Sequence, residues 1–151
     1  MKLIQILSLA CLAFIFVSCG DDVEQVDRVA VDDQLILDYL SANNITATKH
    51  ESGLYYTIEE EGSGSHPTAS SIVSVDYKGY LLDGTVFEEN TINGGSLSGY
   101  ITGWQIGIPL LKKGGSGTLY IPSYYGYGSR SGNTIPANSV LIFEVTLKDF
   151  K

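Results

Sequence analysis

The side chains that stand out for chemistry in this sequence are aromatic rather than ionisable. The chain holds one Trp, ten Tyr and five Phe, but only two Cys and two His. His50 and His66 are isolated in polar stretches without a second His or Cys at ligand spacing, so we expect no metal site. No serine has the flanking pattern of a nucleophile elbow, and the glycines from Gly126 onward miss the dinucleotide fingerprint. We therefore expect neither a nucleophile elbow nor a dinucleotide-binding site. Trp104 and the tyrosines at 124, 125 and 127 remain as candidates, although packing alone would explain each one.

The charge distribution excludes one class of partner. The formal net charge is -8, and 11 of the 17 acidic residues fall within residues 20–61, where Arg28 and Lys49 are the only Lys or Arg residues. A chain with this balance would be repelled by a phosphate backbone, so we expect no nucleic-acid partner. Residues 62–151 carry no net charge and are rich in glycine and tyrosine.

Residues 1–18 are typical of a secretory signal. Lys2 precedes an almost unbroken apolar run over residues 3–17. As a helix this run would rise only about 22 Å, less than the roughly 30 Å of a bilayer core, which disfavours a transmembrane anchor. Ser18 and Cys19 follow the run directly, which resembles a bacterial lipoprotein signal and implies a lipid on Cys19. A plain secretory signal with an incidental cysteine is the alternative.

The lipoprotein interpretation predicts where the protein works. A lipid on Cys19 would hold it on a membrane of the bacterial cell envelope, and we expect the outer membrane, on its periplasmic or surface face. Cys11 would leave with the signal, so the mature chain would have no free thiol and no disulfide.

Residues 19–50 are predicted to form an acidic tether and a short helix. Asp32 or Asp33 can cap a helix that runs to about Ala42 and ends at residues 43–44. Apolar residues at helical spacing form one stripe, which we expect to pack on the body of the protein; they are Leu35, Ile36, Tyr39 and Leu40. A helix that docks a partner or a second copy is the alternative, although we expect a monomer.

Residues 51–151 alternate strands with turns. Apolar and polar residues alternate over 54–59, 73–82 and 140–150, and each pattern predicts a strand. Asp83-Gly84 indicates a hairpin, and the returning strand is expected to end before a loop at residues 93–95. Trp104, Ile108 and Leu111 share one face of a short predicted helix, residues 118–121 form another strand, and residues 122–138 form a long loop. This order indicates an antiparallel α+β domain.

Four blocks of this body, in order, resemble the FKBP family of peptidyl-prolyl isomerases. They are residues 73–87 (VSVDYKGYLLDGTVF), 101–104 (ITGW), 113–128 (KGGSGTLYIPSYYGYG) and 135–145 (IPANSVLIFEV). The resemblance covers about two-thirds of the chain. It implies an antiparallel half-barrel sheet wrapped around one short helix, with an apolar pocket between them, preceded here by the N-terminal extension helix.

The resemblance also implies which residues form the site. The positions carried over as catalytic are Tyr77, Phe87, Glu88, Ile101, Trp104, Tyr127 and Phe143, and those expected to contact substrate are Tyr100, Tyr125 and Ile135. In the family, Trp104 would form the pocket floor, while the Ile101 N–H and the Tyr127 hydroxyl would donate to substrate carbonyls. Glu88 stands where the family usually has Asp. Gly95 falls where an aromatic residue usually completes the wall, so we expect a gap there.

The implied activity is rotation about X–Pro bonds in exported, proline-containing polypeptides, assisting their folding. Such a reaction needs no nucleophile and no cofactor, which agrees with the inventory above. Two alternatives remain open: a proline-binding module or chaperone with weak catalysis, and a structural lipoprotein that acts through its acidic helix.

Overall fold

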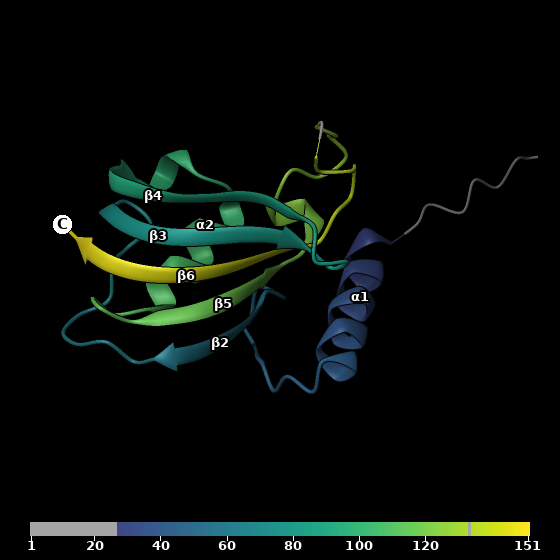
Figure 1. The fold of residues 1–151 in the computed structure, drawn as a ribbon, viewed down its shortest axis with the longest axis horizontal. Helices are drawn as coiled ribbons and strands as arrows, with labels where there is room; N and C mark the ends of the chain where they lie inside the picture. Colours follow the sequence, from purple (N-terminus) through teal and green to yellow (C-terminus); the bar gives the residue numbers. More distant parts are fainter. Residues whose placement is uncertain (1–26, 133) are drawn as a thin grey trace, which may run out of the picture.

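The structure is a computed structural model that describes residues 27–132 and 134–151. The predicted signal, Cys19 and the first part of the predicted tether lie outside the described residues. One six-stranded sheet dominates the fold (Figure 1). All its strands pair antiparallel in the order β1-β2-β5-β6-β3-β4. The strands are β1 (Thr48–Lys49), β2 (Tyr55–Glu60), β3 (Ile72–Leu81), β4 (Val86–Ser96), β5 (Ser116–Ile121) and β6 (Leu141–Phe150).

The sheet curves around one short helix, α2 (Thr102–Gly107), which runs on into a 3-10 turn at Ile108–Leu110. Trp104, Ile108 and Leu111 are all buried in the core between helix and sheet, as their shared face predicted. Two glycines of α2, Gly103 and Gly107, lie where an added Cβ would collide with side chains of β5. Close approach of helix and sheet therefore explains a helix of such poor intrinsic propensity. Two further 3-10 turns lie at Leu97–Gly99 and Ser123–Tyr125.

The α+β prediction and the half-barrel with one short helix are confirmed. The period-two patterns of β3 and β6 place their apolar side chains in the same core as α2, because successive strand residues face opposite sides. Buried members of this core from the two strands are Val73, Val75, Leu81, Leu141, Phe143, Val145 and Leu147.

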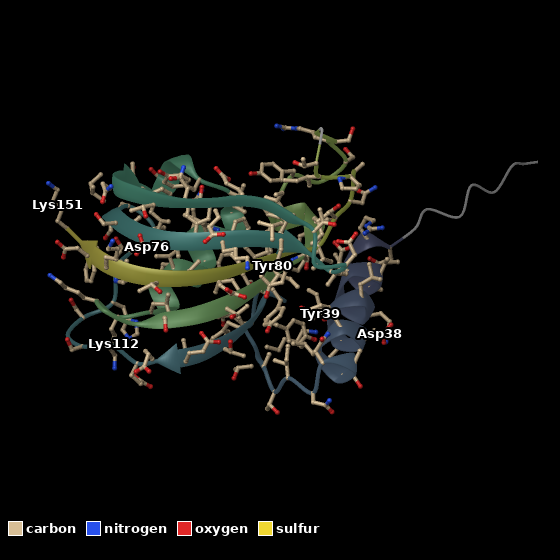
Figure 2. The ribbon with its side chains drawn as sticks, viewed as in Figure 1. Asp38, Tyr39, Asp76, Tyr80, Lys112 and Lys151 are labelled. Atoms are coloured by element: carbon tan, nitrogen blue, oxygen red, sulfur yellow. The ribbon has the colours of Figure 1, made fainter. Side chains whose placement is uncertain are left out.

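The N-terminal helix α1 (Arg28–Ala42) packs on the opposite face of the sheet, at one end. Its Ile36 and Leu40 are buried against residues of β2, β5 and β6, namely Tyr55, Tyr120 and Ile142. In Figure 2, Tyr39 points from α1 toward the sheet and Asp38 points away from it. The expected packing on the body is therefore observed, but Leu35 is 38% exposed and lies outside the buried stripe.

Two predicted boundaries were wrong. Helix α1 begins at Arg28 rather than after Asp32, because the Asp27 carboxylate accepts hydrogen bonds from the N–H groups of Val29 and Ala30 and caps the helix there. Residues 93–95 belong to β4 rather than to a loop. A register shift in the β3–β4 pairing absorbs Gly94, whose φ is 73°, so these glycines form a bulge in an edge strand.

None of the helices within the described residues is long and apolar enough to cross a membrane.

Candidate functional site

Seven of the predicted site residues surround one cavity of about 140 Å³. Strands β3, β4 and β6, the start of α2 and the long loop at residues 122–138, here called the tyrosine loop, all contribute to it. The lining residues are Tyr77, Glu88, Ile92, Tyr100, Ile101, Trp104, Tyr127 and Phe143. Residues that are far apart in the sequence thus form one hollow lined mainly by aromatic side chains, with phenol hydroxyls and the Glu88 carboxylate among its polar groups.

Aromatic rings build the floor and one wall of the cavity. The Trp104 ring meets the rings of Tyr77 and Phe143 edge-on, with centroids 4.9 and 5.4 Å apart, and lies 5.3 Å from the ring of Tyr100. Phe87 lies outside the lining residues and supports the wall through an edge-on contact with Phe143 at 5.5 Å. Gly79 leaves the room for this contact, because a Cβ there would collide with both phenylalanine rings.

The floor residue carries an unpaired donor. Trp104 is 3% exposed, and its indole Nε1 is buried with no hydrogen-bond partner among the described residues. An unpaired buried donor costs about 1–3 kcal/mol. A bound polar group or a water molecule that accepted from this N–H would recover that free energy.

A hydrogen bond to the other side of the same peptide group fixes the orientation of the Ile101 N–H. Nε2 of Gln105 donates to the carbonyl oxygen of Tyr100 at 2.8 Å. That carbonyl and the Ile101 N–H belong to one planar trans peptide and point in opposite directions. The hydrogen bond therefore holds the peptide plane, and with it the direction of the N–H. Ile101 itself precedes α2, and its carbonyl accepts from the N–H of Trp104 at 2.9 Å.

A carboxylate and two phenols meet at the mouth of the cavity. Burial raises the pKa of Tyr77 well above its usual range, and the Glu88 carboxylate beside it raises that pKa further. Partial burial of the Tyr127 side chain, and then the Glu88 carboxylate, also raise the pKa of Tyr127. Both hydroxyls therefore stay protonated near neutral pH and can donate hydrogen bonds. Glu88 and Tyr127 are themselves exposed, so they lie on the rim rather than in the floor.

Two predicted substrate contacts lie outside this cavity. Tyr125 is held elsewhere, since its hydroxyl donates to the carbonyl of Ser52 at 3.3 Å and its ring contacts that of Tyr124. Ile135 lines a neighbouring hollow of about 190 Å³, which shares Tyr127 with the first cavity. Ile135 is therefore placed for a flanking contact, and Tyr125 is placed to support the loop.

The expected gap beside Gly95 is absent. A Cβ at Gly95 would collide with the Tyr100 side chain, so this tyrosine fills the space. Ile92 and Gln105 are site residues that sequence reasoning missed. Ile92 sits in an irregular strand that was expected to end earlier, and nothing in the spacing of Gln105 marks its backbone contact.

Metal ligands do not gather in the described part of the chain. Among residues 27–132 and 134–151, no three His, Cys, Asp or Glu side chains lie where they could hold a metal ion. What the cavity offers chemically is a set of aromatic faces together with hydrogen-bonding groups at its edges.

Comparison with known proteins gives a consistent result. The family described as FKBP-type peptidyl-prolyl cis-trans isomerase matches residues 63–148. A probable FKBP-type isomerase, FkpA, of Neisseria meningitidis is 46% identical over 101 residues, which are 64% of this chain and 37% of the relative. FkpA of Aeromonas hydrophila is 38% identical over 132 residues, which are 82% of this chain and 48% of the relative. The chain thus spans less than half the length of these two relatives.

Solved structures agree with the sequence comparison. The crystal structure of FkpA from Escherichia coli superposes with a TM-score of 0.69 at 33% identity, covering 82% of this chain and 61% of that one. A peptidyl-prolyl isomerase from Pseudomonas syringae superposes with a TM-score of 0.70, covering 82% of this chain and 93% of that one. At 24% identity, the second likeness supports the fold alone.

Proposed function

Because the chain belongs to the FKBP-type peptidyl-prolyl cis-trans isomerase family, we propose that it catalyses rotation about X–Pro bonds in the cavity floored by Trp104. The observation that carries this proposal is the convergence of seven family positions on one aromatic hollow.

The proposed mechanism is desolvation of the amide. Rotation about an X–Pro bond faces a barrier of about 20 kcal/mol, because amide resonance must be broken. The planar amide separates more charge than the twisted one. An apolar pocket therefore disfavours the planar ground state relative to the twisted state, which lowers the barrier without a nucleophile or a titrating group.

Hydrogen bonds would hold the substrate while the bond turns. In the proposed complex the Ile101 N–H, oriented through Gln105, meets one substrate carbonyl, and the Tyr127 hydroxyl meets another. The raised pKa of Tyr127 supports this role, because the hydroxyl keeps its proton over the working pH range. In the proposed complex the unpaired Nε1 of Trp104 would be a third donor for the bound substrate.

The proposed substrates are proline-containing exported polypeptides. This part of the proposal rests on the sequence of the N-terminus, where residues 1–18 are typical of a secretory signal and Cys19 fits lipid attachment. Anchored in this way at the bacterial cell envelope, the enzyme would assist folding after export.

A turnover assay with matched variants tests the activity. The chain from residue 20 should isomerise a proline-containing peptide, and Trp104→Leu should lower kcat/KM at least about tenfold by removing the aromatic floor. Ile108→Ala is the control, because Ile108 is equally buried on the next turn but does not line the cavity. It should lose stability and keep its kcat/KM.

Two results would contradict the proposal. Turnover that survives loss of Trp104 would separate the activity from this cavity. Binding of proline peptides without turnover would instead identify a proline-binding module or chaperone.

A further inference from the structure

A buried carboxylate connects α1 to the tyrosine loop. Asp32 is 0% exposed, although it lies on the N-terminal helix. One carboxylate oxygen accepts two hydrogen bonds from Ser123, from its backbone N–H at 2.8 Å and from its hydroxyl at 2.6 Å. Ser123 is itself 1% exposed and begins the 3-10 turn of the loop. A buried charge is costly unless it is fully paired, so the hydrogen bonds from Ser123 stabilise the Asp32 carboxylate in its buried position.

Arg28 completes the pairing and reaches the other end of the loop. Its guanidinium forms an ion pair with Asp32, one helical turn away. The same nitrogen donates to the backbone carbonyl of Asn138 at 3.0 Å. The first two turns of α1 therefore contact the tyrosine loop where it leaves β5 and where it returns to β6.

Within the loop, Ser123 and Asn138 hold the backbone on both sides of Tyr127. The carbonyl of Ser123 accepts from the N–H groups of Gly126 at 3.0 Å and Gly128 at 2.8 Å. The N–H of Asn138 donates to the carbonyl of Gly128 at 2.7 Å. Tyr127 thus stands between two glycines that depend on Ser123 and Asn138 for their position. Glycines are the residues with most conformational freedom to lose, so these anchors matter for the tyrosine.

We propose that Arg28 and Asp32 are positioning residues for Tyr127, acting through Ser123 and Asn138. This inference rests on the proposed isomerase function for its effect on turnover, but not for its effect on the loop. The family match begins at residue 63, so the helix that carries these two residues lies outside the matched segment. In this protein the N-terminal helix would help to position the tyrosine of the site.

A neighbouring aspartate on the same helix supplies a matched control. Asp33 accepts from the Tyr55 hydroxyl at 2.8 Å and from Lys49 at 2.6 Å, and so connects α1 to the sheet rather than to the loop. Asp32→Asn removes the ion pair with Arg28 and replaces one carboxylate oxygen by an NH2 donor, so the single oxygen that remains cannot accept from both Arg28 and Ser123. Asp33→Asn removes a charge of the same sign one position along the helix and leaves the tyrosine loop untouched.

The first measurement is amide hydrogen exchange, which does not require turnover. In Asp32→Asn we expect faster exchange at Gly126, Gly128 and Asn138, at least about tenfold at a temperature where the protein is fully folded. In Asp33→Asn we expect exchange at these three amides to stay within about twofold of wild type. Unchanged loop exchange in Asp32→Asn, or the same increase in both variants, would overturn the proposal.

The second measurement is a double-mutant cycle on kcat/KM. Asp32→Asn should lower kcat/KM by about three- to tenfold, within the range that small misplacements of a catalytic group cause. If Asp32 acts through the Tyr127 hydroxyl, this loss should shrink to less than about twofold in a Tyr127→Phe background. A structural role alone would give the same factor in both backgrounds, and that result would overturn the proposal.

Folding and the proposed function are controlled separately. If Asp32→Asn does not fold, Ser123→Ala takes its place, since it removes the hydroxyl donor and keeps the backbone N–H. If the wild-type chain shows no turnover, the proposed function fails, and the exchange pattern alone decides whether the helix holds the loop.

Discussion

The hydroxyl of Tyr127 can be removed without removing its ring. Tyr127→Phe keeps the aromatic surface of the rim and should leave the free energy of unfolding nearly unchanged, because the side chain is 43% exposed. It should lower kcat/KM by a modest factor, since one neutral hydrogen bond contributes roughly 0.5–1.5 kcal/mol. Peptide turnover by wild type and variant, with thermal melts of both, measures the two effects. Tyr124→Phe, in the same loop but outside the cavity, should change neither.

The raised phenol pKa values predict a flat pH profile. Free tyrosine titrates near pH 10, and burial with the nearby Glu88 carboxylate moves Tyr77 and Tyr127 above that. A raised pKa keeps the protonated form populated to higher pH, so both hydroxyls remain donors throughout the neutral range. We expect kcat to vary by less than about twofold from pH 6 to 9. A bell-shaped profile that disappears in Glu88→Gln would show acid–base catalysis and contradict the desolvation mechanism.

Individual site residues differ in how far the sequence could predict them. The family resemblance implied Tyr77, Trp104 and Phe143 as pocket residues, and all three line the cavity. It could not show that Tyr100 occupies the space beside Gly95, because that depends on the path of the chain between β4 and α2. Nor could it show that the Tyr125 hydroxyl, implied to contact substrate, donates to a carbonyl in the turn before β2.

At the scale of elements, the contact of α1 with the sheet can be weakened at one position. Ile36 is 0% exposed and packs against residues of β2, β5 and β6. Ile36→Ala should lower the free energy of unfolding by about 2–5 kcal/mol, the usual cost of a cavity in a core. Leu37→Ala, 42% exposed on the same helix, should cost less than about 0.5 kcal/mol. Denaturant unfolding of the two variants checks the difference, and equal costs would mean that α1 is not docked in solution.

The helices and strands also show which sequence patterns were sufficient to predict an element and its ends. Alternation over residues 73–82 and 140–150 predicted β3 and β6 because one face of each strand is buried along most of its length. The start of α1 was missed because three aspartates could cap it, and those at 32 and 33 make tertiary contacts instead. The far end of β4 was missed because an Asn-Gly-Gly run is typical of a turn, and only its pairing with β3 reveals a bulge.

At the scale of the whole molecule, the proposed attachment to a membrane would depend on one residue. If Cys19 is the lipidation site, Cys19→Ser should abolish incorporation of labelled fatty acid and release the protein from the membrane fraction, since several acyl chains are needed for stable anchoring. Cys11→Ser, within the predicted signal, should keep the label. Full labelling of Cys19→Ser would rule out the lipoprotein assignment and favour a plain secretory signal.

The contacts between α1 and the tyrosine loop lie close to the point where the predicted tether joins the domain, so a force on the tether would act on them. Residues 1–26 join the described chain at Asp27, beside the turn of α1 that holds the tyrosine loop, whereas Lys151 lies at the opposite end of the sheet (Figure 1). Tension on an anchored N-terminus would therefore load Arg28 and Asp32 first, before it reached the paired strands. We expect a pulling force applied at Asp27 to loosen the Tyr127 backbone well before the sheet opens. Single-molecule stretching with the force applied at Asp27, and then at Lys151, would measure the difference in unfolding force. An enzyme built in this way would lose efficiency when its tether is stretched and regain it when the tether is slack.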